Sequence, residues 1–209
     1  MPSAAHAYPL GFTSLALRPE LARIVAHGFL DYGDWAAAKH HILSTNALQT
    51  RTASTAKRFE QEVRRRLQSL TIPQLELLAT APLDTCRALT WLAVLKTTPL
   101  MLAFAAGVLR HKLDAGDPVL RPSDYENFFA NHAIAHPALQ QCTPKTKVKI
   151  RSVLFSMLRE VGILIPLEKD ETIRRPPLPE EVRASILQDN PRWLAGFLVS
   201  DAELCTLHD

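Results

Sequence analysis

The sequence predicts a mostly helical protein, on three observations. Apolar residues recur at intervals of three and four along most of the chain, as in helices that bury one face. Serine, threonine, aspartate or proline precedes most of these segments, and these residues favour helix starts. With 209 residues, 47% of them apolar, the chain can bury a core as one domain or two small ones. We expect an all-α fold with an N-terminal helix-turn-helix unit, a central apolar helix pair and a C-terminal winged-helix-like unit.

Three helices are expected in the first 70 residues. Pro19 begins the first and Gly33 ends it, and Asp34 caps the second, which ends near Asn46. The third lies in the stretch 44–70, where apolar residues recur at helical spacing. These apolar residues are Ala56, Phe59, Val63, Leu67 and Leu70. Three helices joined by short turns are the minimum for a helix-turn-helix unit.

The middle of the chain is predicted to form helices over residues 71–82, 84–95 and 98–115. The last two are apolar on most faces, which is typical of helices inside a bundle. Lys96 and Pro99 divide this apolar stretch and leave 13 uncharged residues from Thr97 onward. That length is below the roughly 20 apolar residues of a membrane-spanning helix, so we expect two buried core helices.

The C-terminal half begins with Ser123-Asp124-Tyr125-Glu126, which has the form of a capping box and predicts a helix through Phe129. Residues 131–142 are expected to form a shorter helix or a turn. Thr143 and Pro144 repeat the helix-start signal, and Gly162 is a suitable end for the helix that follows.

Two short strands are expected after this helix, over residues 163–167 and 171–174. A basic helix followed by a small hairpin is the layout of a winged helix, although Pro166 limits strand pairing. Arg174 to Pro179 is expected to be an extended linker before two short terminal helices. The predicted domains are an N-terminal helix-turn-helix bundle, central helices with the winged-helix-like unit, and a C-terminal linker with short helices. Their ranges are residues 1–81, 82–175 and 176–209.

Positive charge is concentrated in two segments, although the net charge of the chain is only +3. Residues 44–66 hold six cations and two acids, and residues 144–159 hold five cations and no acid. The rest of the chain is therefore net acidic. Such a distribution favours a polyanionic partner for the two basic segments, although solvated basic helix faces are also common.

Both basic segments suit contacts with a nucleic-acid backbone. Hydroxyls and backbone N–H groups at a helix start bind phosphate oxygens, and the following cations reach along or into a groove. Alternating lysines spread charge around the second helix, which suits backbone tracking better than base reading. Arg66 lies beside the apolar stripe, so it is expected to pair with an acid. The predicted DNA-binding residues are Arg51, Thr52, Ser54, Thr55, Lys57, Arg58, Gln61, Arg65, Lys145, Thr146, Lys147, Lys149 and Arg151.

No set of residues points to catalysis, a metal or a cofactor. His132 and His136 are four residues apart, but Pro137 follows directly and no HExxH pattern accompanies them. With seven glycines, the chain has no phosphate-binding loop of the GxxxxGK or GxGxxG type. We expect a protein that is not an enzyme. The enzyme alternative would gain support if several of Asp124, Glu126, His132 and His136 converged in one pocket.

The cysteines and the N-terminus favour a cytoplasmic protein. Cys86, Cys142 and Cys205 are far apart and odd in number, which argues against a disulfide framework. The first twelve residues lack the basic start and apolar run of a signal peptide.

Two groups of motifs resemble the BrxA family of BREX phage-defence systems. The first group is N-x-L-Q, T-x-x-R and R-L, at Asn46–Gln49, Thr55–Arg58 and Arg66–Leu67. The second is T-x-x-K at Thr146–Lys149 and V-L-F-x-M-L-R-E-x-G at Val153–Gly162. Tyr125 and Phe128 lie between the two groups as in that family, and the likeness covers about residues 10 to 165. Val161 departs from the family pattern, where a smaller residue is expected before the glycine.

The resemblance implies a small, mostly helical, cytoplasmic protein that binds double-stranded DNA and works with other BREX subunits. No membrane association is expected, because the apolar stretches are too short to span a bilayer. The family fold is similar to that of the NusB antitermination protein, an RNA-binding helical bundle, so RNA is an alternative ligand. A second alternative is an adaptor whose basic faces dock an acidic surface on another BREX subunit. Sequence preference in the DNA and the oligomeric state are not predicted.

Overall fold

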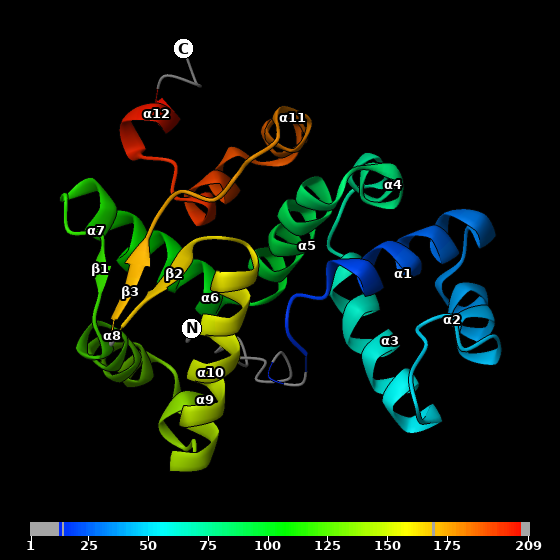
Figure 1. The fold of residues 1–209 in the computed structure, drawn as a ribbon, viewed down its shortest axis with the longest axis horizontal. Coiled ribbons are helices and arrows are strands. Elements are labelled where there is room, and N and C mark those ends of the chain that lie inside the picture. The colour runs from blue at the N-terminus through cyan, green and yellow to red at the C-terminus, as the bar shows by residue number, and fades with distance from the viewer. Residues whose placement is uncertain (1–12, 14, 169, 206–209) are drawn as a thin grey trace, which may run out of the picture. The chain divides into compact units, whose positions relative to one another are not determined.

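The computed structural model describes residues 13, 15–168 and 170–205, and it is mostly helical with one small sheet (Figure 1). The predicted all-α fold class is confirmed, with a sheet of three short strands added to the helices. The segment 1–12, where no signal peptide is predicted, and the side chain of Cys205 lie outside the described residues.

The described chain divides into two compact units. The helical unit comprises residues 15–97 and 177–191, and the mixed unit comprises residues 98–176 and 192–205. These divisions differ from the predicted domain boundaries after residues 81 and 175. The helix that follows residue 82 lies with the N-terminal helices, and so does the segment 177–191.

Six helices form the helical unit. They are α1 (Pro19–Tyr32), α2 (Trp35–Ser44), α3 (Ala53–Leu67), α4 (Ile72–Thr80), α5 (Leu83–Thr97) and α11 (Glu180–Asp189). Helix α1 packs against α2, α3, α4 and α5, and α11 packs against α4 and α5. Gly28 lets α1 approach α2 closely, because a Cβ there would lie 3.0 Å from Ile42 Cδ1.

The predicted helix starts and stops in this unit are confirmed. The side chains of Asp34, Thr52 and Thr71 accept hydrogen bonds from backbone N–H groups in the first turns of α2, α3 and α4. Gly33 adopts a left-handed conformation with φ of 65° and ends α1.

Helix α5 is buried on nearly every side, as its apolar sequence predicts. Lys96 near its end lies 2.6 Å from Asp189 of α11, and its Nζ also donates to the Ser69 carbonyl oxygen. Thr85 donates a 2.7 Å hydrogen bond to Glu181, also of α11. The segment expected to be part of a separate C-terminal region therefore completes the core of the helical unit.

The mixed unit carries most of the remaining elements. Its helices are α6 (Pro99–Phe104), the π-helical segment η2 (Ala105–Leu109), α7 (Arg110–Asp114), α8 (Pro122–Ala135), α9 (Pro137–Gln140), α10 (Pro144–Glu160) and α12 (Asp201–Cys205). The 3-10 segment η3 (Pro191–Phe197) also belongs to this unit, apart from its first residue.

The capping box predicted at Ser123 and Glu126 is wrong. Asp124 accepts from the Arg121 backbone N–H, because α8 begins earlier, at Pro122. Ser200 and Glu203 form the reciprocal bonds of a capping box at the start of the last helix.

The sheet contains β1 (Val119–Leu120), β2 (Leu164–Leu167) and β3 (Asp170–Ile173), in the antiparallel order β1-β3-β2. The predicted hairpin is confirmed, and Pro166 explains why it can form. The Arg174 N–H donates to the Ile163 carbonyl oxygen, so alternate residues of β2 bond to β3. Pro166 then lies at a position whose backbone faces the open edge, where no N–H is needed.

Candidate nucleic-acid interface

The start of α3 is built from hydroxyl side chains. Thr52 Oγ1 accepts from the Thr55 N–H at 3.2 Å and lies within 3.2 Å of the Ser54 and Thr55 hydroxyls. Asn46 accepts from the Thr50 N–H and donates to its carbonyl oxygen, which holds the preceding turn. The predicted phosphate-binding groups Thr52, Ser54 and Thr55 are therefore brought together at one helix N-terminus.

Exposed cations follow these hydroxyls. Arg51, Lys57 and Arg58 are exposed, and none has a carboxylate within ion-pair distance among the described residues. Gln61, one turn further, is exposed as well. These residues are available for contacts with a polyanion, as the sequence predicts.

The three consecutive arginines of α3 are engaged by acids. Arg64 Nε lies 2.7 Å from Glu60, and Arg65 makes two hydrogen bonds to Glu62, at 2.8 and 3.0 Å. Arg65 keeps part of its side chain exposed, but its guanidinium is held by Glu62, which it shares with Arg66. The cation count of the sequence therefore overstates the charge that α3 presents.

Arg66 is the buried member of this network, as expected from its place beside the apolar stripe. Its Nε donates to Glu62 at 2.8 Å, and its two terminal nitrogens donate to the Ala16 and Leu15 carbonyl oxygens. The residue is only 1% exposed. Arg66 therefore anchors the segment that precedes α1 and does not face solvent.

A pocket of about 660 Å³ lies beside the start of α3, entirely within the helical unit. Arg18, Arg51 and Thr55 line it together with Glu20 and Phe59. The pocket shows that the hydroxyls and Arg51 border a concave surface and are not scattered.

The start of α10 resembles that of α3 in its capping but differs in its charge. Thr143 accepts from the Thr146 N–H at 3.2 Å, so Thr146 lies in the first turn. Lys145, Lys147 and Lys149 are exposed, and no described carboxylate pairs with them. This end of α10 presents uncompensated positive charge at a helix N-terminus.

Arg151 lies against aromatic rings, as does Lys147 one turn before it. Its guanidinium lies 5.7 Å from the Tyr125 ring centroid and 5.3 Å from that of Phe155, and Lys147 lies 5.8 Å from that of Phe129. Burial raises the pKa of the Tyr125 hydroxyl, so this ring is a neutral surface for the cation. Arg151 is therefore held against α8.

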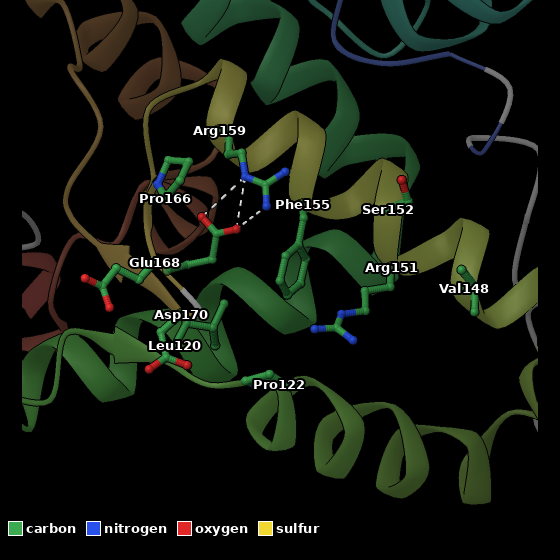
Figure 2. Close-up of a pocket in the computed structure, with 11 residues that line it drawn as sticks. Leu120, Pro122, Val148, Arg151, Ser152, Phe155, Arg159, Pro166, Glu168 and Asp170 are labelled. Atoms are coloured by element: carbon green, nitrogen blue, oxygen red, sulfur yellow. Dashed lines mark hydrogen bonds and ion pairs between the residues drawn. The ribbon is translucent and has the colours of Figure 1, made fainter.

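A pocket of about 450 Å³ lies between α10 and the hairpin, and it contains both signs of charge (Figure 2). Arg151 and Arg159 line one side, and Glu168, Asp170 and Glu171 line the other. Glu171 pairs with Arg159, whose pKa it raises through this hydrogen bond. An acidic hairpin beside a basic helix is not a continuous surface for phosphate groups.

Another pocket brings together three residues of the enzyme alternative. Asp124, His132 and His136 line a space of about 540 Å³ in the mixed unit, whereas Glu126 is exposed elsewhere. The Asp124 carboxylate forms an ion pair with Lys112 and accepts a hydrogen bond from the Arg121 backbone N–H. In the part of the chain that the structure describes, no cluster of three His, Cys, Asp or Glu residues could hold a metal.

The cysteines and the apolar helices also have defined places. Cys86 and Cys142 are free thiols, the first of them buried. Over the described residues, no single helix is long and apolar enough to cross a membrane, and only the broken pair Leu83–Thr97 and Pro99–Asp114 has the combined length and composition.

Comparisons with known proteins identify the family. The BrxA family model matches residues 6–190. The chain belongs to the BrxA family. The BREX protein BrxA of Bacillus cereus (strain H3081.97) is 25% identical over 144 residues, which are 69% of this chain and 72% of the relative. The resemblance predicted from the motifs is thus confirmed.

A solved structure shows the same fold. An uncharacterized protein from Magnetospirillum magneticum superposes with a TM-score of 0.79 at 18% identity, over 91% of this chain and 97% of that chain. The fold shared with that protein therefore covers most of this chain, beyond the two groups of motifs.

Proposed function

We propose that this BrxA-family protein is a non-catalytic component of a BREX phage-defence system that binds double-stranded DNA through phosphate contacts, with little sequence preference. The place in BREX rests on the family and on the printed name of the Bacillus relative. The DNA contact rests on one observation above all. Lys145, Lys147 and Lys149 project from the start of a 17-residue helix with no described carboxylate to compensate them.

The order of elements in the mixed unit supports a winged-helix interpretation. Strand β1, helix α8, helix α10 and the hairpin β2–β3 follow one another, and the sheet order is β1-β3-β2. In that arrangement α10 is the helix presented to DNA. Because Glu168 and Asp170 flank the hairpin turn, we place the phosphate contacts at the first two turns of α10 and not at the hairpin.

The start of α3 is the second proposed contact. Its hydroxyls and backbone N–H groups are positioned for phosphate oxygens, and Arg51, Lys57 and Arg58 add charge. Base-specific readout is not part of the proposal, since lysines and hydroxyls at a helix start contact phosphates without reporting sequence.

The test is binding of the purified protein to a labelled random-sequence duplex across a salt series, with structured RNA as competitor. Replacing Lys145, Lys147 and Lys149 together with alanine should weaken binding and lower the salt slope by about 2.7, since each phosphate contact contributes about 0.9 on B-form DNA. A matched variant that removes three cations elsewhere, Lys39, Arg87 and Arg183, should retain the slope.

Three other results would contradict the proposal. Equal affinity and slope in the lysine variant would remove α10 from the interface. Absence of binding at low salt would favour an adaptor whose basic helices dock an acidic subunit. Structured RNA that displaces the duplex at equal salt would favour RNA as the ligand.

A further inference from the structure

The pocket of about 540 Å³ in the mixed unit has the size of a small-ligand site and is separate from the lysines of α10. One wall is the π-helical segment Ala105–Leu109, and the other is a face of α8. The proposed DNA contacts do not use this pocket.

Aromatic rings form a column along one wall. Phe128 and His132 are stacked with centroids 5.1 Å apart and an interplanar angle of 21°. The His136 ring follows at 4.7 Å, and Phe104 lies 4.9 Å from Phe128 on the other side. Burial, with the neighbouring His136, lowers the pKa of His132, so this ring is neutral at pH 7. Flat aromatic ligands stack on surfaces of this kind.

Two amides accompany the rings. Asn127 and Asn131 are four residues apart on α8 and both line the pocket. Both side chains are exposed to solvent, and neither has a hydrogen-bond partner within the described part of the protein. A carboxamide offers one donor and one acceptor side by side, the pattern that pairs with N6 and N7 of adenine.

The opposite wall leaves room for a ring. Gly107 lies in the π-helical segment, and a Cβ built there would meet nothing within 4 Å. Such π-helical turns are frequent at functional sites. Lys112 at the pocket is already paired with Asp117 and Asp124, so it is not available as a phosphate anchor.

We propose that this pocket binds a purine base, adenine by preference, with the base stacked on His136 at the end of the column of Phe104, Phe128 and His132 and its edge bonded to Asn127 and Asn131. The base belongs either to a free nucleotide or to an unpaired position of a nucleic-acid strand. Because the pocket offers ring faces and amides and no free lysine, adenosine should bind about as well as AMP.

The test is isothermal titration of the full chain with adenosine, AMP, guanosine and a ten-residue single-stranded deoxyadenosine oligonucleotide. Replacing Asn127 and Asn131 together with alanine should weaken adenosine binding about tenfold or more, by analogy with one lost bidentate base contact. The matched control replaces Gln140 and Gln141, two exposed amides outside the pocket, and should bind adenosine like the wild type.

A second variant fills the space directly. Gly107→Leu should abolish adenosine binding, while an unchanged melting temperature shows that the fold is retained. The oligonucleotide binding more tightly than AMP would assign the base to a strand, and equal affinity would assign it to a free nucleotide. Absence of binding up to millimolar adenosine, or equal binding by the wild type and both pocket variants, would overturn the proposal.

The pocket and the lysines of α10 lie on different elements of the mixed unit. Gly107→Leu should leave the salt slope for duplex DNA unchanged, because Gly107 lies outside the lysine surface of α10. Loss of duplex binding in the lysine variant with adenosine binding retained would separate the two sites.

Discussion

The two basic helices have similar sequences but use their cations differently. In α3 the arginines at positions 64 to 66 pair with Glu60 and Glu62, and the most buried of them holds the backbone of residues 15 and 16. In α10 the lysines of the first two turns have no described carboxylate partner. A count of cations therefore has a different meaning in each helix. In α3 it includes arginines that form ion pairs within the helix, and in α10 it counts lysines that face solvent.

The largest effect is expected where the cation is buried. Arg66→Ala removes one hydrogen bond to Glu62, which keeps Arg65 as a partner, and two hydrogen bonds to the Ala16 and Leu15 carbonyl oxygens. Each buried hydrogen bond from a charged group contributes about 1.5–3 kcal/mol, so the free energy of unfolding measured in urea should fall by about 3–5 kcal/mol. A loss below about 1 kcal/mol would show that Arg66 is not an anchor. The matched control is Arg87→Ala, which breaks an exposed ion pair with Asp84 and should cost less.

The next comparison concerns the exposed cations of the two helices. Replacing Arg51, Lys57 and Arg58 with alanine should lower the duplex salt slope by at most about 2.7, and the affinity should fall less than in the variant that lacks Lys145, Lys147 and Lys149. The reason is that Glu20, Glu60 and Glu62 lie in the same unit and reduce the positive potential there. A larger loss for the α3 variant would reverse the ranking of the two helices.

A single substitution at Arg65 also tests whether ion-paired cations of α3 contribute less to DNA binding than the unpaired lysines of α10. It is among the predicted DNA-binding residues, but two bonds to Glu62, which also pairs with Arg66, hold its guanidinium on the helix and partly offset its charge. Arg65→Ala should therefore change the salt slope by clearly less than the 0.9 or so expected for one phosphate contact. Lys147→Ala is the matched variant on α10 and should produce a change near that full value.

Much of the fold follows from sequence patterns. Caps at Asp34, Thr52 and Thr143 lie where residue type and apolar spacing place them, because these signals are local. The hairpin also follows from local patterns, and Pro166 fits once the register puts it at the open edge. Strand β1 was not predicted, since two residues carry no periodic signal.

The site was less predictable, because it depends on contacts between residues whose partners are set by the fold. Arg64 and Arg65 lie four and three residues after Glu60 and Glu62, which is the spacing of ion pairs along a helix. The charge count of the segment nevertheless treated both arginines as available to a partner. The position of Arg151 against Tyr125 depends on packing across 26 residues of chain. The π-helical turn at Gly107 has no sequence signal that distinguishes it from a continuous helix.

The smallest effect is expected for an exposed ion pair, which completes the contrast with Arg66. A hydrogen bond from Lys112, with help from Arg121, lowers the pKa of Asp117 from 3.8 to about 2. Since the folded pKa lies below the unfolded one, this stabilisation is present above about pH 4 and is lost as the pH falls toward 2. The Asp117 side chain is 44% exposed, so solvent screens the pair in part, and Asp117→Asn should shift the melting temperature only slightly at pH 7. At pH 2, Asp117→Asn and the wild type should melt at the same temperature. At pH 7, Arg66→Ala should destabilise the protein by far more than Asp117→Asn does. A large effect of Asp117→Asn would mean that exposure does not decide how much an ion pair stabilises this protein.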